Sequence, residues 1–118
     1  MLNKQAIRTL IQQGHWDEAK RICAELCKAS PKDADAWLLM GVIHGQFGNF
    51  AEAEKCSRRV TALSPAAPVG HFNLGITLQK QRKFAEAAKS LQQAIKLNPN
   101  YAEAHNELGA ALQLGGGD

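Results

Sequence analysis

Three cysteines are the first candidates for chemistry in this chain of 118 residues: Cys23, Cys27 and Cys56. Cys23 and Cys27 are four residues apart, so they would share one face of a helix and could form a metal-binding or redox pair. An odd number of cysteines without a C-x-x-C pair is typical of neither a disulfide framework nor a zinc site. No histidine or third cysteine is positioned to complete a set of ligands. We therefore expect small thiols buried in the core, with no metal and no cofactor.

Four histidines could act as a general base, namely His15, His44, His71 and His105. None of them has a nucleophile and an acid at a spacing that would complete a catalytic arrangement. A phosphate loop is also absent, because Gly41-x-x-x-Gly45 falls within a predicted helix. His71 and His105 occupy the position that Trp37 has in an earlier repeat, which indicates packing rather than catalysis. We do not expect the chain to be an enzyme.

Composition and charge point to a protein-binding role. The net charge is +3, and the basic pairs, of which Arg58–Arg59 is one, are scattered among acids. This pattern favours solvated surface charge over phosphate contacts, so we expect no nucleic acid. The chain has neither an apolar run of the roughly 20 residues that cross a bilayer nor the apolar core of a signal peptide. We expect a cytoplasmic protein without a membrane partner.

The spacing of three prolines organises the whole chain. Pro31, Pro65 and Pro99 are 34 residues apart, and a period of this size indicates one helical unit copied in tandem. We expect a single array over residues 1–114 and a flexible tail over 115–118. The copies would span residues 1–33, 34–67, 68–101 and, for the first helix of a truncated fourth copy, 102–114.

Apolar residues at helical spacing predict two helices in each complete copy and no strand. The predicted helices span residues 2–13, 16–29, 34–46, 50–63, 68–80, 84–97 and 102–114. Gly41, Gly75 and Gly109 would let a second helix approach closely, and Ala53 and Ala87 would face the first two of these glycines. The predicted fold class is all-α, with about seven helices.

The repeated pattern resembles the tetratricopeptide repeat family over nearly the whole chain. The residues that carry the resemblance in the third copy are His71, Leu74–Gly75, Leu78, Phe84, Ala87, Leu91, Ala94 and Pro99. Those in the second copy are Trp37, Met40–Gly41, His44, Phe50, Ala53, Ser57, Val60 and Pro65. The resemblance implies a right-handed α-solenoid of antiparallel helix pairs. It also implies a concave groove, lined by the first helix of each copy, that binds a peptide or an amphipathic helix.

Transferring the family's groove positions to this chain yields a groove with an apolar centre. The expected lining residues are Lys4, Arg8, Leu38, Val42, Gln46, Phe72, Asn73, Ile76, Gln79, Lys80, Asn106 and Ala110. Some family members clamp a terminal carboxylate with lysines, asparagines and an arginine, but Leu39 and Val69 occupy two of those positions here. The arrays of O-GlcNAc transferases present a ladder of asparagines, of which this chain keeps Asn73.

The last predicted helix keeps an apolar face that a following helix would cover. We expect Leu108, Ala111, Leu112 and Leu114 to form a self-association face, or the chain to be a fragment of a longer protein. The predicted function is a module for protein–protein interaction. The alternative is the N-terminal substrate-recruiting region of a larger enzyme, such as a glycosyl- or sulfotransferase. The sequence does not identify the partner.

Overall fold

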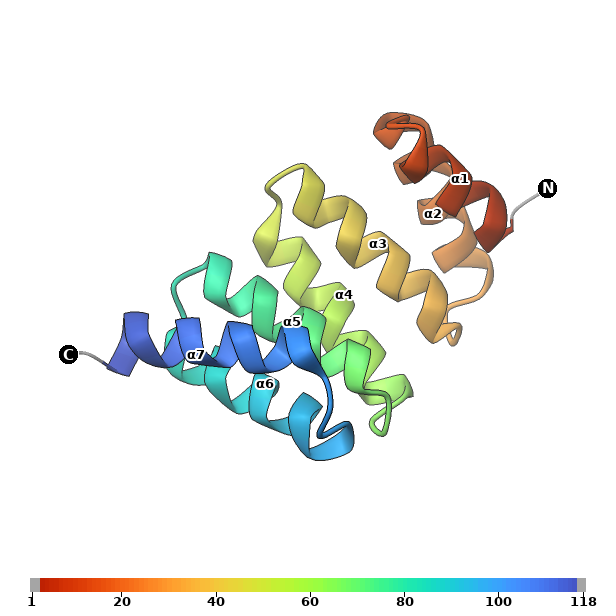
Figure 1. Cartoon of the computed structure of the whole chain (residues 1–118). Coiled ribbons are helices and arrows are strands. Elements are labelled where there is room, and N and C mark those ends of the chain that lie inside the picture. The colour runs from red at the N-terminus through yellow and green to blue at the C-terminus, as the bar shows by residue number, and fades with distance from the viewer. Residues whose placement is uncertain (1–2, 117–118) are drawn as a thin grey trace.

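A computed structural model describes residues 3–116, and within that range the chain forms seven α-helices and no strand. The helices are α1 (Lys4–Gln12), α2 (Trp16–Ala29), α3 (Ala34–Gln46), α4 (Phe50–Leu63), α5 (Pro68–Lys80), α6 (Phe84–Leu97) and α7 (Ala102–Gly116). Consecutive helices form antiparallel pairs, and the pairs stack into an elongated array of 48 × 26 × 21 Å (Figure 1). The predicted all-α repeat fold is confirmed.

In the second and third copies, a glycine of the first helix lies at the contact with the second helix. A Cβ atom added to Gly75 of α5 would lie 2.7 Å from Leu91 Cγ and 3.3 Å from the Ala87 carbonyl oxygen of α6. At Gly41 of α3 the nearest atom would be Cys56 Cβ of α4, at 3.4 Å. Gly75 thus has no room for any side chain, because its partner helix already occupies the space. At Gly109 nothing lies within 4 Å, since α7 has no second helix to receive within residues 3–116.

A ring nitrogen joins the first helix of a copy to the loop that precedes it. Trp37 Nε1 donates a hydrogen bond to the Pro31 carbonyl oxygen at 2.8 Å. His71 Nε2 and His105 Nε2 lie 2.9 Å from the carbonyl oxygens of Pro65 and Pro99. The tautomer that carries hydrogen on Nε2 therefore reproduces the indole contact. The position of Trp37, His71 and His105 is therefore structural, as predicted. What recurs there is an aromatic ring that also donates a hydrogen bond.

The three thiols are core residues, as the sequence predicts. Cys23, Cys27 and Cys56 are buried in the first of two apolar clusters, together with Ile7, Met40 and Ile43. Cys23 Sγ donates to the Ala36 carbonyl oxygen at 3.4 Å. Burial raises the pKa of Cys56 to about 11, so this thiol is protonated at neutral pH.

Ion pairs connect neighbouring copies. Glu54 of α4 accepts from Gln81 at 2.8 Å and from Lys83 at 3.3 Å, both in the turn of the next copy, and from Arg58 on its own helix at 2.9 Å. Burial opposes the charge of Glu54, but these three donors outweigh it and lower the pKa of the carboxyl. Glu54 therefore links α4 to the α5–α6 turn while it is ionised.

The C-terminal helix differs from the expectation in two ways. It continues through Gly116, so Gly115 and Gly116 do not belong to a flexible tail, and residues 117–118 lie outside the described residues. A Cβ on Gly115 would lie 2.5 Å from Phe84 Cβ, so the helix packs on α6 at its end. The missing side chain of Gly115 allows this contact.

The second difference is that only part of the expected self-association face is exposed. Ala111 is buried in the second apolar cluster, to which α5 contributes Leu78 and α6 contributes Leu91, and Leu108 packs against that cluster. Both helices therefore cover this side of α7. Leu112 and Leu114 remain 50% and 56% exposed. Self-association stays a prediction that rests on these two leucines.

Replacing Ala87 by leucine is expected to overpack the contact between α5 and α6. Ala87 is fully buried, and the opposing glycine leaves no free space, so the variant should lose about 1–3 kcal/mol of unfolding free energy. A urea titration followed by circular dichroism measures the change. Ala85→Leu, on the exposed side of the same helix, is the matched control. Equal stability of the two variants would contradict the packing described at Gly75.

The Glu54 cluster predicts a loss of stability in acid. Because the pKa of Glu54 is lowered by folding from its usual 4.5, its contribution is present above that pH and is lost as the pH falls through the folded value. Glu54→Gln should therefore flatten the decline in unfolding free energy below about pH 4.5. Glu25→Gln, at an exposed position on α2, serves as the control and should leave the decline unchanged. Identical profiles for wild type and Glu54→Gln would refute this role.

Candidate functional site

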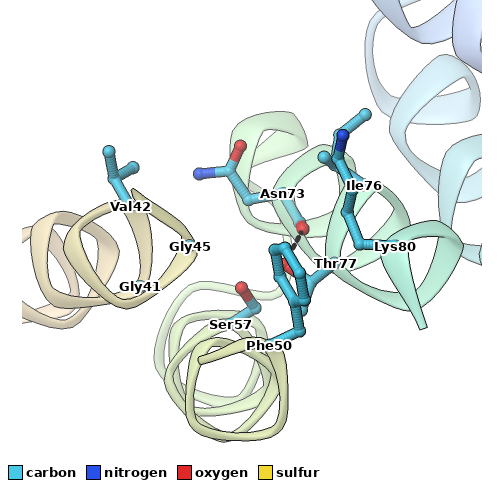
Figure 2. A pocket seen from close by; sticks show the side chains of 9 residues that line it. All are labelled: Gly41, Val42, Gly45, Phe50, Ser57, Asn73, Ile76, Thr77 and Lys80. Atoms are coloured by element: carbon cyan, nitrogen blue, oxygen red, sulfur yellow. Dashed lines mark hydrogen bonds between the residues drawn. The ribbon is translucent and has the colours of Figure 1, made fainter. Parts of the chain in front are cut away.

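A cavity of about 210 Å³ lies where α3, α4 and α5 meet. We call it the α3–α5 groove. Figure 2 shows its lining, with Val42 on one side, Asn73 and Ile76 on the other and Phe50 below. The lining residues are Gly41, Val42, Gly45, Phe50, Ser57, Asn73, Ile76, Thr77 and Lys80. All three helices are therefore needed to form the site.

The α3–α5 groove combines apolar walls with a few polar groups. Val42 is 44% exposed, which is high for a large apolar side chain, and it faces the cavity together with Ile76. The Asn73 side chain points into the space between Val42 and Ile76 (Figure 2). The Thr77 hydroxyl donates to the Asn73 backbone oxygen at 2.8 Å and is thereby turned towards its own helix. The Lys80 ammonium is the cation among the lining residues. Such a surface can hold an apolar side chain and a few hydrogen-bonding groups.

Two glycines four residues apart keep the α3 wall thin. Gly41 and Gly45 lie on the same face of α3, and both line the cavity. Gly41 packs against α4, whereas nothing lies within 4 Å of the position that a Cβ on Gly45 would take. The glycine at position 45 is therefore not required by packing, and its effect is to leave the groove open.

Four of the predicted groove residues line this cavity: Val42, Asn73, Ile76 and Lys80. Gln79 lines a neighbouring cavity between α5 and α7, and its Oε1 is buried without a hydrogen-bond partner among the described residues. The other predicted residues on α1, α3 and α7 do not line the α3–α5 groove. Of these, Leu38 and Ala110 are half-buried, and Arg8, Gln46 and Asn106 are exposed.

Two predicted groove residues are engaged in other contacts. Phe72 stacks on Tyr101 with ring centroids 4.9 Å apart and packs against the second apolar cluster, so it belongs partly to the core. Lys4 Nζ lies 3.0 Å from Asp33 Oδ2 and 3.6 Å from Asp35 Oδ2, so its charge is neutralised. Leu39, which occupies one of the family's clamp positions, packs against the first apolar cluster. The positive charge of Lys4 is therefore less available to a ligand than that of an unpaired lysine would be.

Five residues that line the cavity were not among the groove positions predicted from the sequence: Gly41, Gly45, Phe50, Ser57 and Thr77. Phe50 and Ser57 come from α4, the second helix of its copy, whereas the family's groove positions lie on first helices. The spacing of the two glycines was the available signal. Both of these glycines line the cavity.

Two models of tetratricopeptide repeats match the sequence, one over residues 7–71 and the other over residues 81–116. The chain belongs to the tetratricopeptide repeat family. Together the two matches cover both halves of the array, and the first alone spans more than half of the chain. No curated protein sequence matches significantly.

Solved structures of tetratricopeptide proteins superimpose well on this chain. The first repeat domain of Spaghetti (RPAP3), bound to the HSP90 peptide SRMEEVD, is 25% identical with a TM-score of 0.90, over 93% of this chain and 87% of that one. MamA is 25% identical with a TM-score of 0.83, over 89% of this chain and 61% of that one.

An O-GlcNAc transferase of Thermobaculum terrenum is similar over a small part of its length. It is 30% identical with a TM-score of 0.78, and the match covers 95% of this chain but 23% of the transferase. The similarity therefore concerns a helical array within a much longer protein.

No helix in the described part of the chain combines the length and the apolar character that crossing a membrane requires.

The open space beside Gly45 predicts that Gly45→Ala stabilises the protein. Alanine adds no clash at this position and reduces the freedom of the unfolded chain, so the unfolding free energy should rise by about 0.5–1 kcal/mol. Chemical denaturation measures the difference. Gly75→Ala is the contrasting variant and should destabilise, because its Cβ would clash with Leu91. A loss of stability in Gly45→Ala would show that α3 is packed there after all.

Proposed function

We propose that this chain is a protein-interaction module that binds an extended peptide in the α3–α5 groove. The observation that carries the proposal is the position of the Asn73 side chain between two apolar walls, Val42 and Ile76, in a cavity that three helices form. A groove of this kind can hold one apolar side chain of a peptide and one of its backbone amides together.

Asn73 suits a peptide backbone because its amide group both donates and accepts. A peptide unit offers one N–H and one C=O, and a side-chain amide can pair with both. The backbone contact would not depend on the peptide's sequence, so selectivity would come from the apolar side chain next to it. The volume of about 210 Å³ favours a single side chain over a row of them.

Charge favours a peptide with an acidic residue near the Lys80 end of the groove. Lys80 is exposed and lines both the α3–α5 groove and the neighbouring cavity. Lys4, in contrast, is engaged by Asp33 and Asp35. A terminal carboxylate would therefore find an exposed ammonium at Lys80, whereas that of Lys4 is already paired. The tetratricopeptide domain of RPAP3, which is bound to a peptide ending in EEVD, is the relative that supports a peptide ligand.

Selection from a random peptide library displayed on phage tests the proposal with the full chain. We expect peptides with one apolar residue and a nearby acidic residue to be enriched. Their synthetic forms should bind Val42→Asp and Asn73→Ala at least about tenfold more weakly than wild type, since a charge would enter the apolar wall or the backbone contact would be lost. Fluorescence anisotropy measures the affinities.

Leu63→Asp is the matched control for that experiment. It places the same charge at another exposed apolar position, at the end of α4 and outside the α3–α5 groove, and should leave affinity unchanged. Selected peptides that bind both groove variants as tightly as wild type would overturn the proposal. Enrichment of no peptide at all would also count against it.

A second candidate is an array that recruits substrates for a larger enzyme. The match to the O-GlcNAc transferase of Thermobaculum terrenum, which covers nearly the whole of this chain, favours it. In such a protein the groove would engage the polypeptide substrate, and catalysis would come from another domain. The coding sequence beyond Asp118 distinguishes the two candidates: a transferase domain there supports the second, and a stop codon excludes it.

A further inference from the structure

A second cavity, of about 510 Å³, lies between α2 and α4 and is also lined by α3. We call it the α2–α4 cleft. Its lining residues are Ala24, Cys27, Lys28, Pro31, Trp37, Met40, His44, Glu52, Lys55, Cys56 and Arg59. None of them lines the α3–α5 groove, because Trp37, Met40 and His44 form one stripe of α3 and Gly41, Val42 and Gly45 form another. The two cavities are therefore separate sites that share α3 as a wall.

The interior of the α2–α4 cleft is apolar and polarisable. Trp37 contributes an indole, Met40 a thioether, and Cys27 and Cys56 contribute thiols that are 4% and 6% exposed. Sulfur and aromatic groups make favourable contacts with an aromatic or acyl body. The volume falls within the range of about 300–1,000 Å³ that is typical of small-molecule sites.

The rim of the α2–α4 cleft carries more positive than negative charge. The lining residues include three cations, Lys28, Lys55 and Arg59, and one carboxylate, Glu52. Lys55 Nζ pairs with Glu52 Oε1 at 3.3 Å, which leaves Lys28 and Arg59 as the charge in excess among the lining residues. An anionic group at the rim would be attracted by both of them.

Arg59 is held in position before any ligand arrives. Its guanidinium lies over the Trp37 ring, 4.6 Å from the centroid, and the indole is itself fixed by its hydrogen bond to the Pro31 carbonyl oxygen. A stacked guanidinium keeps the N–H groups at its edge free, and a carboxylate, sulfonate or phosphate can accept hydrogen bonds from them. The ordering cost of binding an anion is therefore reduced.

His44 adds one polar group to the lining. Its Nδ1 is buried and has no hydrogen-bond partner among the described residues. Burial and the nearby Lys20 charge lower the pKa of the imidazole, so the ring is neutral at pH 7. A buried polar atom without a partner favours occupation of the site by a group that can hydrogen-bond to it.

We propose that the α2–α4 cleft is a binding site for a small amphiphilic anion, with an aromatic or short acyl body and one anionic group. The body would lie against Trp37 and Met40, and the anionic group would lie at Arg59 and Lys28. This site is independent of the proposed peptide function, because it uses other residues and another face of α3.

The fluorescent aromatic sulfonate 1-anilinonaphthalene-8-sulfonate is a suitable probe for the full chain. We expect saturable enhancement of its emission at a stoichiometry of one dye per chain under native conditions. Arg59→Gln should weaken binding about tenfold, because one charged partner is removed. Ala24→Leu keeps every charge but fills the cleft, and should weaken binding by a similar factor. Far-UV circular dichroism checks that each variant is folded.

Two controls separate the cleft from general surface binding. Lys89→Gln removes an exposed cation on α6, outside the cleft, and should leave affinity unchanged, as should Val42→Asp in the α3–α5 groove. The uncharged dye N-phenyl-1-naphthylamine should bind wild type and Arg59→Gln alike. Absence of saturable sulfonate binding, or equal binding by wild type, Arg59→Gln and Ala24→Leu, would overturn the proposal. Either result would leave the peptide proposal standing, since that is tested by Val42→Asp and Asn73→Ala.

Discussion

The close approach of two helices at a glycine is the constraint on which the array depends. At Gly75 the partner helix is so near that Leu91 fills the space where a side chain of residue 75 would lie. The contact of Gly41 with Cys56 is similar but looser. The distance within a pair sets how the next pair can stack, because each second helix also packs on the following first helix. Both the α3–α5 groove and the α2–α4 cleft lie where such pairs meet.

Links between copies are made by polar groups as well as by apolar packing. A ring nitrogen of Trp37 or His71 binds the loop carbonyl before its helix, and Glu54 joins α4 to the turn between α5 and α6. The ring contacts hold the starts of α3, α5 and α7, whereas the carboxylate holds the end of α5. This division explains why histidine can replace tryptophan here: the position needs a flat side chain with an N–H, which both residues provide.

The period of 34 residues was enough to predict the helices and the family, since every copy repeats the same apolar spacing. The groove was predicted only in part. Val42, Asn73 and Ile76 line the α3–α5 groove, whereas Phe72 stacks on Tyr101 and Lys4 pairs with Asp33. A family position specifies the helix face, not the neighbours that compete for the side chain. The α2–α4 cleft was not predicted at all. Its residues come from three helices, and each of them taken alone has the character of a core or a surface residue.

The empty space at Gly109 bears on how the array moves. Interior helices such as α4 are held by neighbours on both sides, whereas α7 packs on α6 and touches α5. Within residues 3–116, a helix with fewer neighbours opens at a lower cost in free energy than one packed on both sides. Backbone amides of α7 should then exchange hydrogen through local opening, whereas those of α4 should exchange only when the core unfolds. Protection from exchange should therefore be lower in α7 than in α4.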